Sequence, residues 1–153
     1  MIVSELLQRR SVLVPFEAAG LERAVAALVE ALPLPATGAP ERAAIRAAVL
    51  AREAAGSTVI GNGVAIPHAR IPLLPRTVMA AGRAARPIEF GSADVKPVSL
   101  VFLLAIPAED PHSYLPVLAG LSRLASDESL LRGLALAAGP DEFFACIAAF
   151  PLT

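Results

Sequence analysis

One short segment of the sequence carries residues suited to group-transfer chemistry. His68 follows the stretch GNGVAIP, in which Gly61 and Gly63 flank Asn62 and a proline directly precedes the histidine. One nitrogen of a neutral imidazole can attack phosphorus while the other keeps a proton held by a hydrogen bond. The product is a phosphoramidate, from which the phosphoryl group is easily passed on. We interpret His68 as a phosphoryl acceptor; the alternative is a structural histidine, the commoner fate of a single one.

The residues before His68 are suited to hold it rigidly. Pro67 fixes its own φ angle and restricts Ile66, so the chain reaches the histidine with little freedom. The backbone of Gly61 and Gly63 is open to close approach, and its N–H groups can hold phosphate oxygens. The segment therefore predicts a rigidly mounted imidazole beside an anion-binding backbone.

Phosphoryl transfer also needs positive charge near the equatorial oxygens of the phosphoryl group. Arg52 and Arg70 are candidates for that charge. The alternative for each is a solvated surface arginine. We expect Arg52 to be the stronger candidate of the two.

Two amphipathic helices are predicted before the histidine segment. Apolar residues recur at spacings of four, three and four from Leu21 to Leu32, which is typical of one helical face. After a proline-rich loop, Pro40 suits the first position of a second helix over about residues 40–55, and Gly56 suits its C-terminal end. The residues expected to form its buried stripe are Ala44, Ile45, Ala48 and Val49.

Extended segments and three further helices are predicted after Gly56. Residues 57–67 indicate two short extended pieces around the Gly-Asn-Gly turn, and residues 76–84 indicate a strand. Residues 98–106 are almost wholly apolar, which favours a central strand covered on both faces. The N-terminal regions of the last three helices are marked by Ser113, Asp127 and Asp141. This order predicts an α/β fold, with helices packed on a small mixed β-sheet.

Composition is compatible with one soluble domain over residues 1–153. The net charge of −1 gives no global attraction to nucleic acid or to anionic lipid. The longest apolar run, Val98 to Ala108, is shorter than the ~18–20 residues of a membrane-spanning helix. The N-terminal stretch MIVSELLQRR has charged residues where a signal peptide needs an apolar core, so we expect a cytoplasmic protein. Cys146, the only cysteine, is predicted to be a buried core thiol rather than a nucleophile.

The stretch from Arg52 to His68 resembles a known family. It is similar to the type-2 enzyme IIA domains of the bacterial phosphoenolpyruvate-dependent sugar phosphotransferase system, the fructose/mannitol group, which also includes nitrogen-regulatory members. The family pattern is Gly-x-Gly-x-Ala-aliphatic-Pro-His, preceded by Arg-Glu and by a Ser-Thr pair, and the sequence REAAGSTVIGNGVAIPH matches it in order. The resemblance continues in PIEF (87–90), PVSLVFLLAIP (97–107) and LAGL (118–121), and covers roughly residues 2–150.

The resemblance implies a fold, an activity and partners. The fold is a layered α/β/α domain with a mixed sheet flanked by helices. The activity is that of a phosphotransferase with a phosphohistidine intermediate, in which Nε2 of His68 accepts the phosphoryl group and Arg52 supports the transfer. The donor is the histidine-containing phosphocarrier protein and the acceptor is an enzyme IIB domain, with no metal and no organic cofactor. Residues expected to contact the phosphate or to support the site are Thr58, Gly61, Asn62 and Gly63.

The sequence departs from the family pattern at one position. The family has a second histidine at the start of the helix after the apolar strand, and Tyr114 stands at that position here. Either a local shift brings His112 into the site, or Tyr114 replaces the histidine with a hydroxyl donor. A third possibility is that both residues lie on the rim of a loop.

Four functional hypotheses follow. The first is a phosphoryl relay in sugar transport, and Ala69-Arg70 after the histidine resembles the sugar-specific members. The second is a regulatory protein of the nitrogen type, which carries phosphate on His68 and acts by binding other proteins. A metal site built from His68, His112 and Asp110 or Cys146 lacks any local ligand-pair spacing. A homologue that no longer takes phosphate is disfavoured by the intact pattern.

Overall fold

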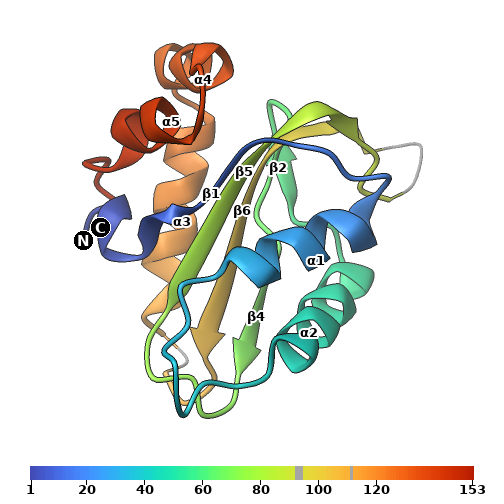
Figure 1. Cartoon of the computed structure of the whole chain (residues 1–153), viewed down its shortest axis with the longest axis vertical. Coiled ribbons are helices and arrows are strands. Elements are labelled where there is room, and N and C mark those ends of the chain that lie inside the picture. The colour runs from blue at the N-terminus through green and yellow to red at the C-terminus, as the bar shows by residue number, and fades with distance from the viewer. Residues whose placement is uncertain (92–94, 111) are drawn as a thin grey trace.

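A mixed sheet lies between two layers of helices in this computed structural model, which describes residues 1–91, 95–110 and 112–153 (Figure 1). The strands are β1 (Leu7–Phe16), β2 (Val59–Gly61), β3 (Val64–Ala65), β4 (His68–Ile71), β5 (Val78–Ile88) and β6 (Val98–Pro107). The helices are the short 3₁₀ turn η1 (Val3–Glu5), α1 (Leu21–Ala31), α2 (Arg42–Ala55), α3 (Tyr114–Ala125), α4 (Glu128–Leu136) and α5 (Pro140–Ile147). Across the described ranges, every helix is too short or too polar to cross a membrane.

Strand β6 is the centre of the sheet. It runs antiparallel to β5 on one side and parallel to β3 and β4 on the other. Strand β1 pairs in parallel with β5, and β2 pairs antiparallel with β3. All of β6 except Ser99 is buried, so the prediction of a central strand covered on both faces is confirmed.

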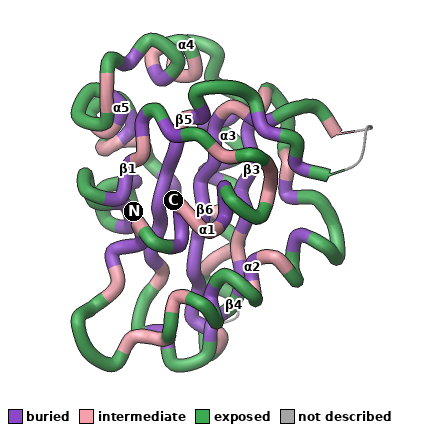
Figure 2. The backbone as a smooth tube through the Cα atoms, turned by 45° about the vertical axis from the view of Figure 1, so that its right-hand side comes forward, coloured by how far each residue is buried: buried purple, intermediate pink, exposed green. Residues whose placement is uncertain are grey.

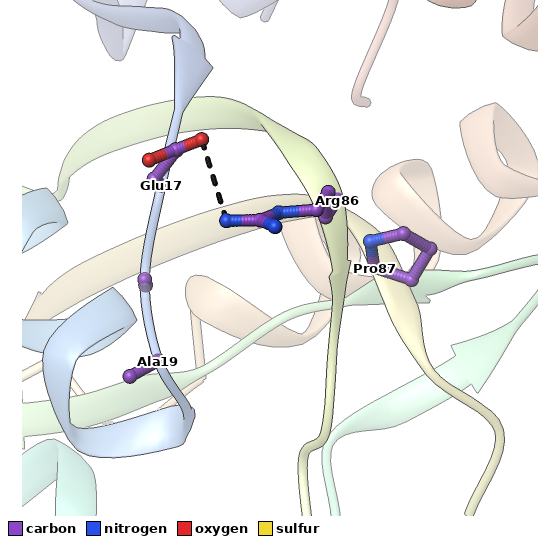
Figure 3. A pocket seen from close by; sticks show the side chains of 5 residues that line it. Glu17, Ala19, Arg86 and Pro87 are labelled. Atoms are coloured by element: carbon purple, nitrogen blue, oxygen red, sulfur yellow. Dashed lines mark ion pairs between the residues drawn. The ribbon is translucent and has the colours of Figure 1, made fainter.

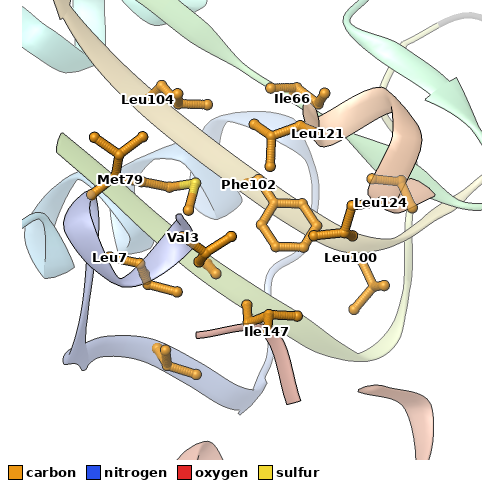
Figure 4. Close-up of a cluster of buried hydrophobic side chains, with 14 of the residues drawn as sticks. Val3, Leu7, Ile66, Met79, Leu100, Phe102, Leu104, Leu121, Leu124 and Ile147 are labelled. Atoms are coloured by element: carbon orange, nitrogen blue, oxygen red, sulfur yellow. The ribbon is translucent and has the colours of Figure 1, made fainter. Parts of the chain in front are cut away.

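Each face of the sheet has its own apolar core. Helices α1 and α2 cover one face, where Leu28 and Val49 pack with Val101 of β6. Helices α3, α4 and α5 cover the other face, where Leu121 packs near Phe102, the next residue of β6 (Figure 4). Consecutive residues of a strand point to opposite faces, which is why one apolar run supplies both cores. Figure 2 shows the buried strands enclosed by helices that expose their outer sides. The layered α/β/α prediction is confirmed.

The boundaries of α2 differ from those expected. Glu41 is the N-cap residue and Arg42 begins the helix, so Pro40 lies before the helix rather than at its first position. Gly56 ends it with φ of 168°, which is extended backbone and not the left-handed conformation. Ala44 is exposed, because the buried stripe is narrower than predicted.

Strand β1 is the largest element that the sequence analysis missed. Its pairing with β5 shifts between Leu7 and Val12, and Gln8, Arg9 and Arg10 between them are exposed. This irregularity breaks the alternation of apolar and polar residues that marks a strand, as bulges do.

The C-terminal helices agree with the prediction in part. Asp127 caps α4 by accepting a hydrogen bond from the N–H of Leu130 at 3.0 Å, as predicted. Ser113 occupies the N-cap position of α3, but its hydroxyl donates to Asp110 Oδ2 at 2.7 Å instead of capping the helix. The prediction for Cys146 is wrong: its side chain is exposed, because α5 buries Phe143 and Ile147 on the opposite side.

Candidate functional site

His68 is the first residue of β4, on the outer edge of the sheet. It pairs with Leu104 of β6. Ala69 and Ile71 belong to the core under α1 and α2, so His68 and Arg70 point toward the face that carries α3. The imidazole is half-buried, which leaves part of the ring open to a docking molecule.

One ring nitrogen of His68 is fixed by the backbone. Nδ1 lies 2.8 Å from the carbonyl oxygen of Ile66. A carbonyl oxygen only accepts hydrogen bonds, so Nδ1 carries the proton and donates it. In the neutral ring Nε2 therefore has a free lone pair and is the nucleophilic nitrogen.

The surroundings hold the pKa of His68 below its ordinary value of 6.5. Burial disfavours the charged ring, and the positive charge of Arg52 acts in the same direction. The hydrogen bond to Ile66 and the negative charge of Glu53 oppose this effect and raise the pKa. The net lowering keeps the ring neutral at pH 7, and only the neutral ring can attack phosphorus.

Arg52 lies in the last turn of α2, on its exposed side. Its Nη1 donates to the carbonyl oxygen of Gly56 at 2.8 Å, which holds the guanidinium beside the connection to β2. Its charge acts on His68, so the two candidate catalytic residues predicted from the sequence influence each other in the folded chain. A guanidinium presents several donors in a plane and is suited to phosphoryl oxygens.

Glu53 was not among the candidate site residues, and it is the only buried carboxylate of the described residues. Its two oxygens accept hydrogen bonds from Thr58, one from the backbone N–H at 2.8 Å and one from the side-chain hydroxyl. The spacing of four from Ile45 to Val49 to Glu53 places the glutamate on the buried face of α2. That spacing was the signal in the sequence.

Thr58 supports the site without being free to bind phosphate. It is 5% exposed, and its hydroxyl is directed at Glu53. Its carbonyl oxygen accepts a hydrogen bond from the N–H of Ile66 at 3.0 Å. The residue therefore fixes the strand segment that leads to His68.

The Gly61-Asn62-Gly63 turn joins β2 to β3, as predicted, but lies apart from His68. The carbonyl oxygen of Gly63 accepts a hydrogen bond from Ser99 N at 2.8 Å, at the start of β6. His68 is in register with Leu104, five residues farther along, which is roughly 16 Å at the rise of a strand. We expected the turn and the imidazole to surround the same phosphate, but this separation places the turn too far from His68 for that.

The turn has a structural role instead. Its three residues all have positive φ, with Asn62 at 53°. Such angles suit Gly and Asn, and they reverse the chain between β2 and β3. Nδ2 of Asn62 donates to the carbonyl oxygen of Ala125 at 2.8 Å, which ties the turn to the C-terminal end of α3.

The two candidates for the second histidine position differ in their surroundings. His112 is exposed, before the start of α3. Tyr114, the first residue of α3, is partly buried against the core that contains Leu104, the partner of His68 in the sheet. Among the hydrogen bonds of the described residues, none joins either side chain to His68. Arg70 is held elsewhere, since its Nη2 donates to the carbonyl oxygen of Ala108 at 2.8 Å.

Two other kinds of site come into question among the described residues, a metal site and a ligand hollow away from His68. The residues put forward for a metal site do not converge, and within ranges 1–91, 95–110 and 112–153 no three His, Cys, Asp or Glu side chains gather. A hollow between the end of β1 and β5 is lined by Glu17, Ala18, Ala19, Arg86 and Pro87 (Figure 3). Its ion pair, 3.7 Å from Arg86 Nη2 to Glu17 Oε1, is exposed to solvent and contributes little.

Comparisons with known proteins agree with this geometry. Residues 5–149 match the family described as "Phosphoenolpyruvate-dependent sugar phosphotransferase system, EIIA 2". The chain is 38% identical over 117 residues to a nitrogen regulatory protein of Bradyrhizobium diazoefficiens, and the alignment covers 76% of each protein.

Solved structures show the same fold. The nitrogen regulatory protein IIA-Ntr of Neisseria meningitidis superposes with a TM-score of 0.85 at 29% identity, over 99% of both chains. The mannitol enzyme IIA of Escherichia coli, in its complex with phosphorylated enzyme IIB, has a TM-score of 0.74 at 22% identity over 92% of this chain and 97% of that one. The mannitol protein supports the fold alone. With a family match over almost its whole length, this chain belongs to the type-2 enzyme IIA family of the phosphoenolpyruvate-dependent sugar phosphotransferase system.

Proposed function

We propose that this chain is a phosphoryl relay, in which Nε2 of His68 accepts a phosphoryl group from a histidine-containing phosphocarrier protein and passes it to an enzyme IIB domain. The observation that carries the proposal is the hydrogen bond from Nδ1 of His68 to the carbonyl oxygen of Ile66. This hydrogen bond keeps the ring proton on Nδ1, so Nε2 has the free lone pair and is the nucleophile. We place this relay in the cytoplasm, where phosphoenolpyruvate and its carrier proteins act.

The chemistry needs little from the protein beyond position and charge. The lone pair of Nε2 forms a bond to phosphorus, and the bond from phosphorus to the donor's imidazole breaks with its electron pair returning to that ring. The proton on Nδ1 stays in place. The guanidinium of Arg52 is exposed, and we propose that it donates hydrogen bonds to the oxygens of the phosphoryl group during the transfer.

A second candidate function is a regulatory protein that signals through phosphorylation of His68. It is favoured by a specific observation: the Bradyrhizobium relative and the Neisseria structure are both named for nitrogen regulation. The Ala69-Arg70 pair, by contrast, resembles the sugar-specific members. The two candidates share the phosphoryl acceptor and differ in what the phosphorylated protein contacts.

A labelling experiment tests the shared part of both candidates. The purified protein is incubated with radiolabelled phosphoenolpyruvate, enzyme I and the phosphocarrier protein. We expect label on the wild type and on His112→Ala, and none on His68→Ala. Label that persists on a folded His68→Ala protein would contradict the assignment. The label should be lost in acid and kept in base, as expected for a phosphoramidate and not for a serine ester.

A second step separates the two candidates. The phosphorylated protein is mixed with enzyme IIB domains encoded in the same genome. Rapid transfer of label to a IIB domain supports the transport relay. Label that stays on His68 in the presence of every such domain supports the regulatory protein.

A further inference from the structure

We propose that Glu53 is a positioning residue for the phosphoryl relay, which holds the imidazole of His68 through Thr58 and Ile66 and balances the positive charge that the ring gains on phosphorylation. The inference rests on the proposed function and deepens it, because it assigns a role to a side chain that does not touch the phosphoryl group.

A continuous set of hydrogen bonds joins Glu53 to His68. The carboxylate accepts from the N–H and the hydroxyl of Thr58, and the carbonyl oxygen of Thr58 accepts from the N–H of Ile66 at 3.0 Å. The carbonyl oxygen of Ile66 then accepts from Nδ1 of His68 at 2.8 Å. Loosening Thr58 would therefore loosen the carbonyl group that fixes the tautomer of the imidazole.

The hydrogen bonds to Thr58 do not by themselves explain why a charged side chain is buried at position 53. A buried carboxylate loses favourable hydration, and two hydrogen bonds from one threonine replace only part of it. Within residues 1–91, 95–110 and 112–153 the two ion pairs join Arg9 to Asp141 and Arg86 to Glu17, so no basic side chain there is paired with Glu53. A neutral glutamine has the length to accept the N–H of Thr58. The retained charge indicates an electrostatic role.

The phosphorylated ring supplies the matching charge. When the lone pair of Nε2 enters the bond to phosphorus, Nδ1 keeps its proton, so the ring becomes a cation while the phosphoryl group carries negative charge. Glu53 is already near enough in the free protein to raise the pKa of His68. The same interaction stabilises the cationic ring of the phosphorylated protein.

Consecutive residues of α2 thus act on the two halves of the phosphohistidine. The guanidinium of Arg52 suits the phosphoryl oxygens, and the carboxylate of Glu53 suits the ring. Among the other elements around His68, β6 contributes no charged residue, and the guanidinium of Arg70 on β4 keeps its charge but donates to the carbonyl oxygen of Ala108. Arg52 and Glu53 are the charged side chains that act on the pKa of His68, and they act in opposite directions.

The decisive experiment compares Glu53→Gln with Glu30→Gln, an exposed glutamate of α1 that serves as the matched control. Nitrogen-15 NMR of the histidine rings gives the pKa of His68 in the free proteins. The equilibrium of phosphoryl exchange with the phosphocarrier protein is measured on the same samples. We expect Glu53→Gln to lower the pKa of His68 and to shift the exchange toward the carrier by on the order of tenfold. Glu30→Gln should match the wild type in both.

The outcomes separate the inference from the proposed function. The inference would be overturned if Glu53→Gln matched Glu30→Gln both in the pKa of His68 and in the exchange equilibrium. The proposed function would still hold in that case, provided that His68 of the wild type takes the label. A wild type that takes no phosphate would overturn the proposed function, and the titration would still decide whether Glu53 acts on the ring. If Glu53→Gln fails to fold, Thr58→Val and Thr58→Ser replace it. We then expect the valine to populate the other ring tautomer and the serine to restore the wild-type spectrum; identical spectra would overturn the inference.

Discussion

At the scale of single residues, the site is a half-buried imidazole on which two opposite charges of α2 act. Burial and Arg52 favour its neutral form, and Glu53 with the Ile66 carbonyl group limits how far the pKa falls. This balance suits a relay, because the ring must be neutral to attack and must then tolerate a positive charge. The chemistry therefore depends on the end of α2 as much as on the strand that carries His68.

The lowered pKa of His68 predicts how stability depends on pH. The unfolded chain binds a proton on this ring more readily than the folded protein does, so stability is fully present above the ordinary pKa of 6.5 and declines as pH falls below it. We expect the free energy of unfolding in urea to fall more for the wild type than for His68→Gln between about pH 7.5 and about pH 5.5. Equal losses in the two proteins would contradict the burial of this ring.

Replacing Arg52 should reveal both of its roles. We expect Arg52→Gln to raise the pKa of His68 and to slow phosphoryl transfer by on the order of tenfold or more, because positive charge is lost beside the phosphoryl group. Stopped-flow transfer kinetics and histidine NMR measure the two effects. Arg46→Gln, an exposed change on the same helix, is the control and should leave both unchanged. A normal rate in Arg52→Gln would reduce Arg52 to a surface charge.

Sequence reasoning could single out His68 as the candidate acceptor because its type and its neighbours are local signals. It gave no role to Glu53, although the family pattern contains Arg-Glu, since a glutamate on a helix is usually solvated and its burial shows only in its spacing from Ile45 and Val49. It also assigned Gly61 and Gly63 to the phosphate, because closeness in sequence suggests closeness in space. An extended strand removes that closeness: each residue carries the chain about 3.3 Å farther away.

At the scale of elements, the site depends on a short edge strand held by its neighbours. Strand β4 spans only His68–Ile71 and has only β6 as a strand partner among the described residues. Four residues are too few to show a period, so the sequence analysis indicates extended pieces only as far as Pro67 and does not predict this strand. Strand β6 could be predicted because its ten residues are apolar with the single exception of Ser99.

Helix α3 packs closely on the C-terminal segment, which gives a sharp prediction. A Cβ atom on Gly120 would lie 2.7 Å from the Cα of Leu152, which is backbone and cannot easily move aside. We expect Gly120→Ala to lower the free energy of unfolding by about 1–3 kcal/mol, despite the better helix propensity of alanine. Thermal and urea unfolding measure the change.

Gly133 in α4 is the matched control for that change. A Cβ atom there would meet Sγ of Cys146 at 3.8 Å, an ordinary contact. Gly133→Ala should therefore be neutral or stabilising, by up to about 1 kcal/mol. Similar destabilisation in both variants would show that the close contact at Gly120 does not decide the result.

The cap of α4 tests a sequence prediction that the structure confirms. The carboxylate of Asp127 accepts the N–H of Leu130, a donor that otherwise has no partner in the helix. We expect Asp127→Ala to cost about 1 kcal/mol and Asp127→Asn to cost less, because the amide oxygen still accepts. Equal costs for both variants in urea unfolding would contradict the capping role.

At the scale of the whole molecule, two helical layers enclose the sheet and leave His68 at its edge. The sheet order places β4 outside β6, and α2 ends beside it, so Arg52 and Glu53 reach the histidine from another element (Figure 1). The fold class followed from the order of elements and from the family resemblance, whereas the strand order depends on long-range pairing that no local pattern encodes. The half-buried ring at this edge is open to a docking molecule, which the proposed relay between two proteins requires.

The most direct test of this account is to find the atom that carries the phosphate. The protein, labelled with nitrogen-15 in its histidines, is phosphorylated through phosphoenolpyruvate, enzyme I and the phosphocarrier protein and studied by NMR under neutral conditions. The account predicts phosphorus on Nε2 of His68, with the proton still on Nδ1. Phosphorus on Nδ1, or on any residue other than His68, would contradict it.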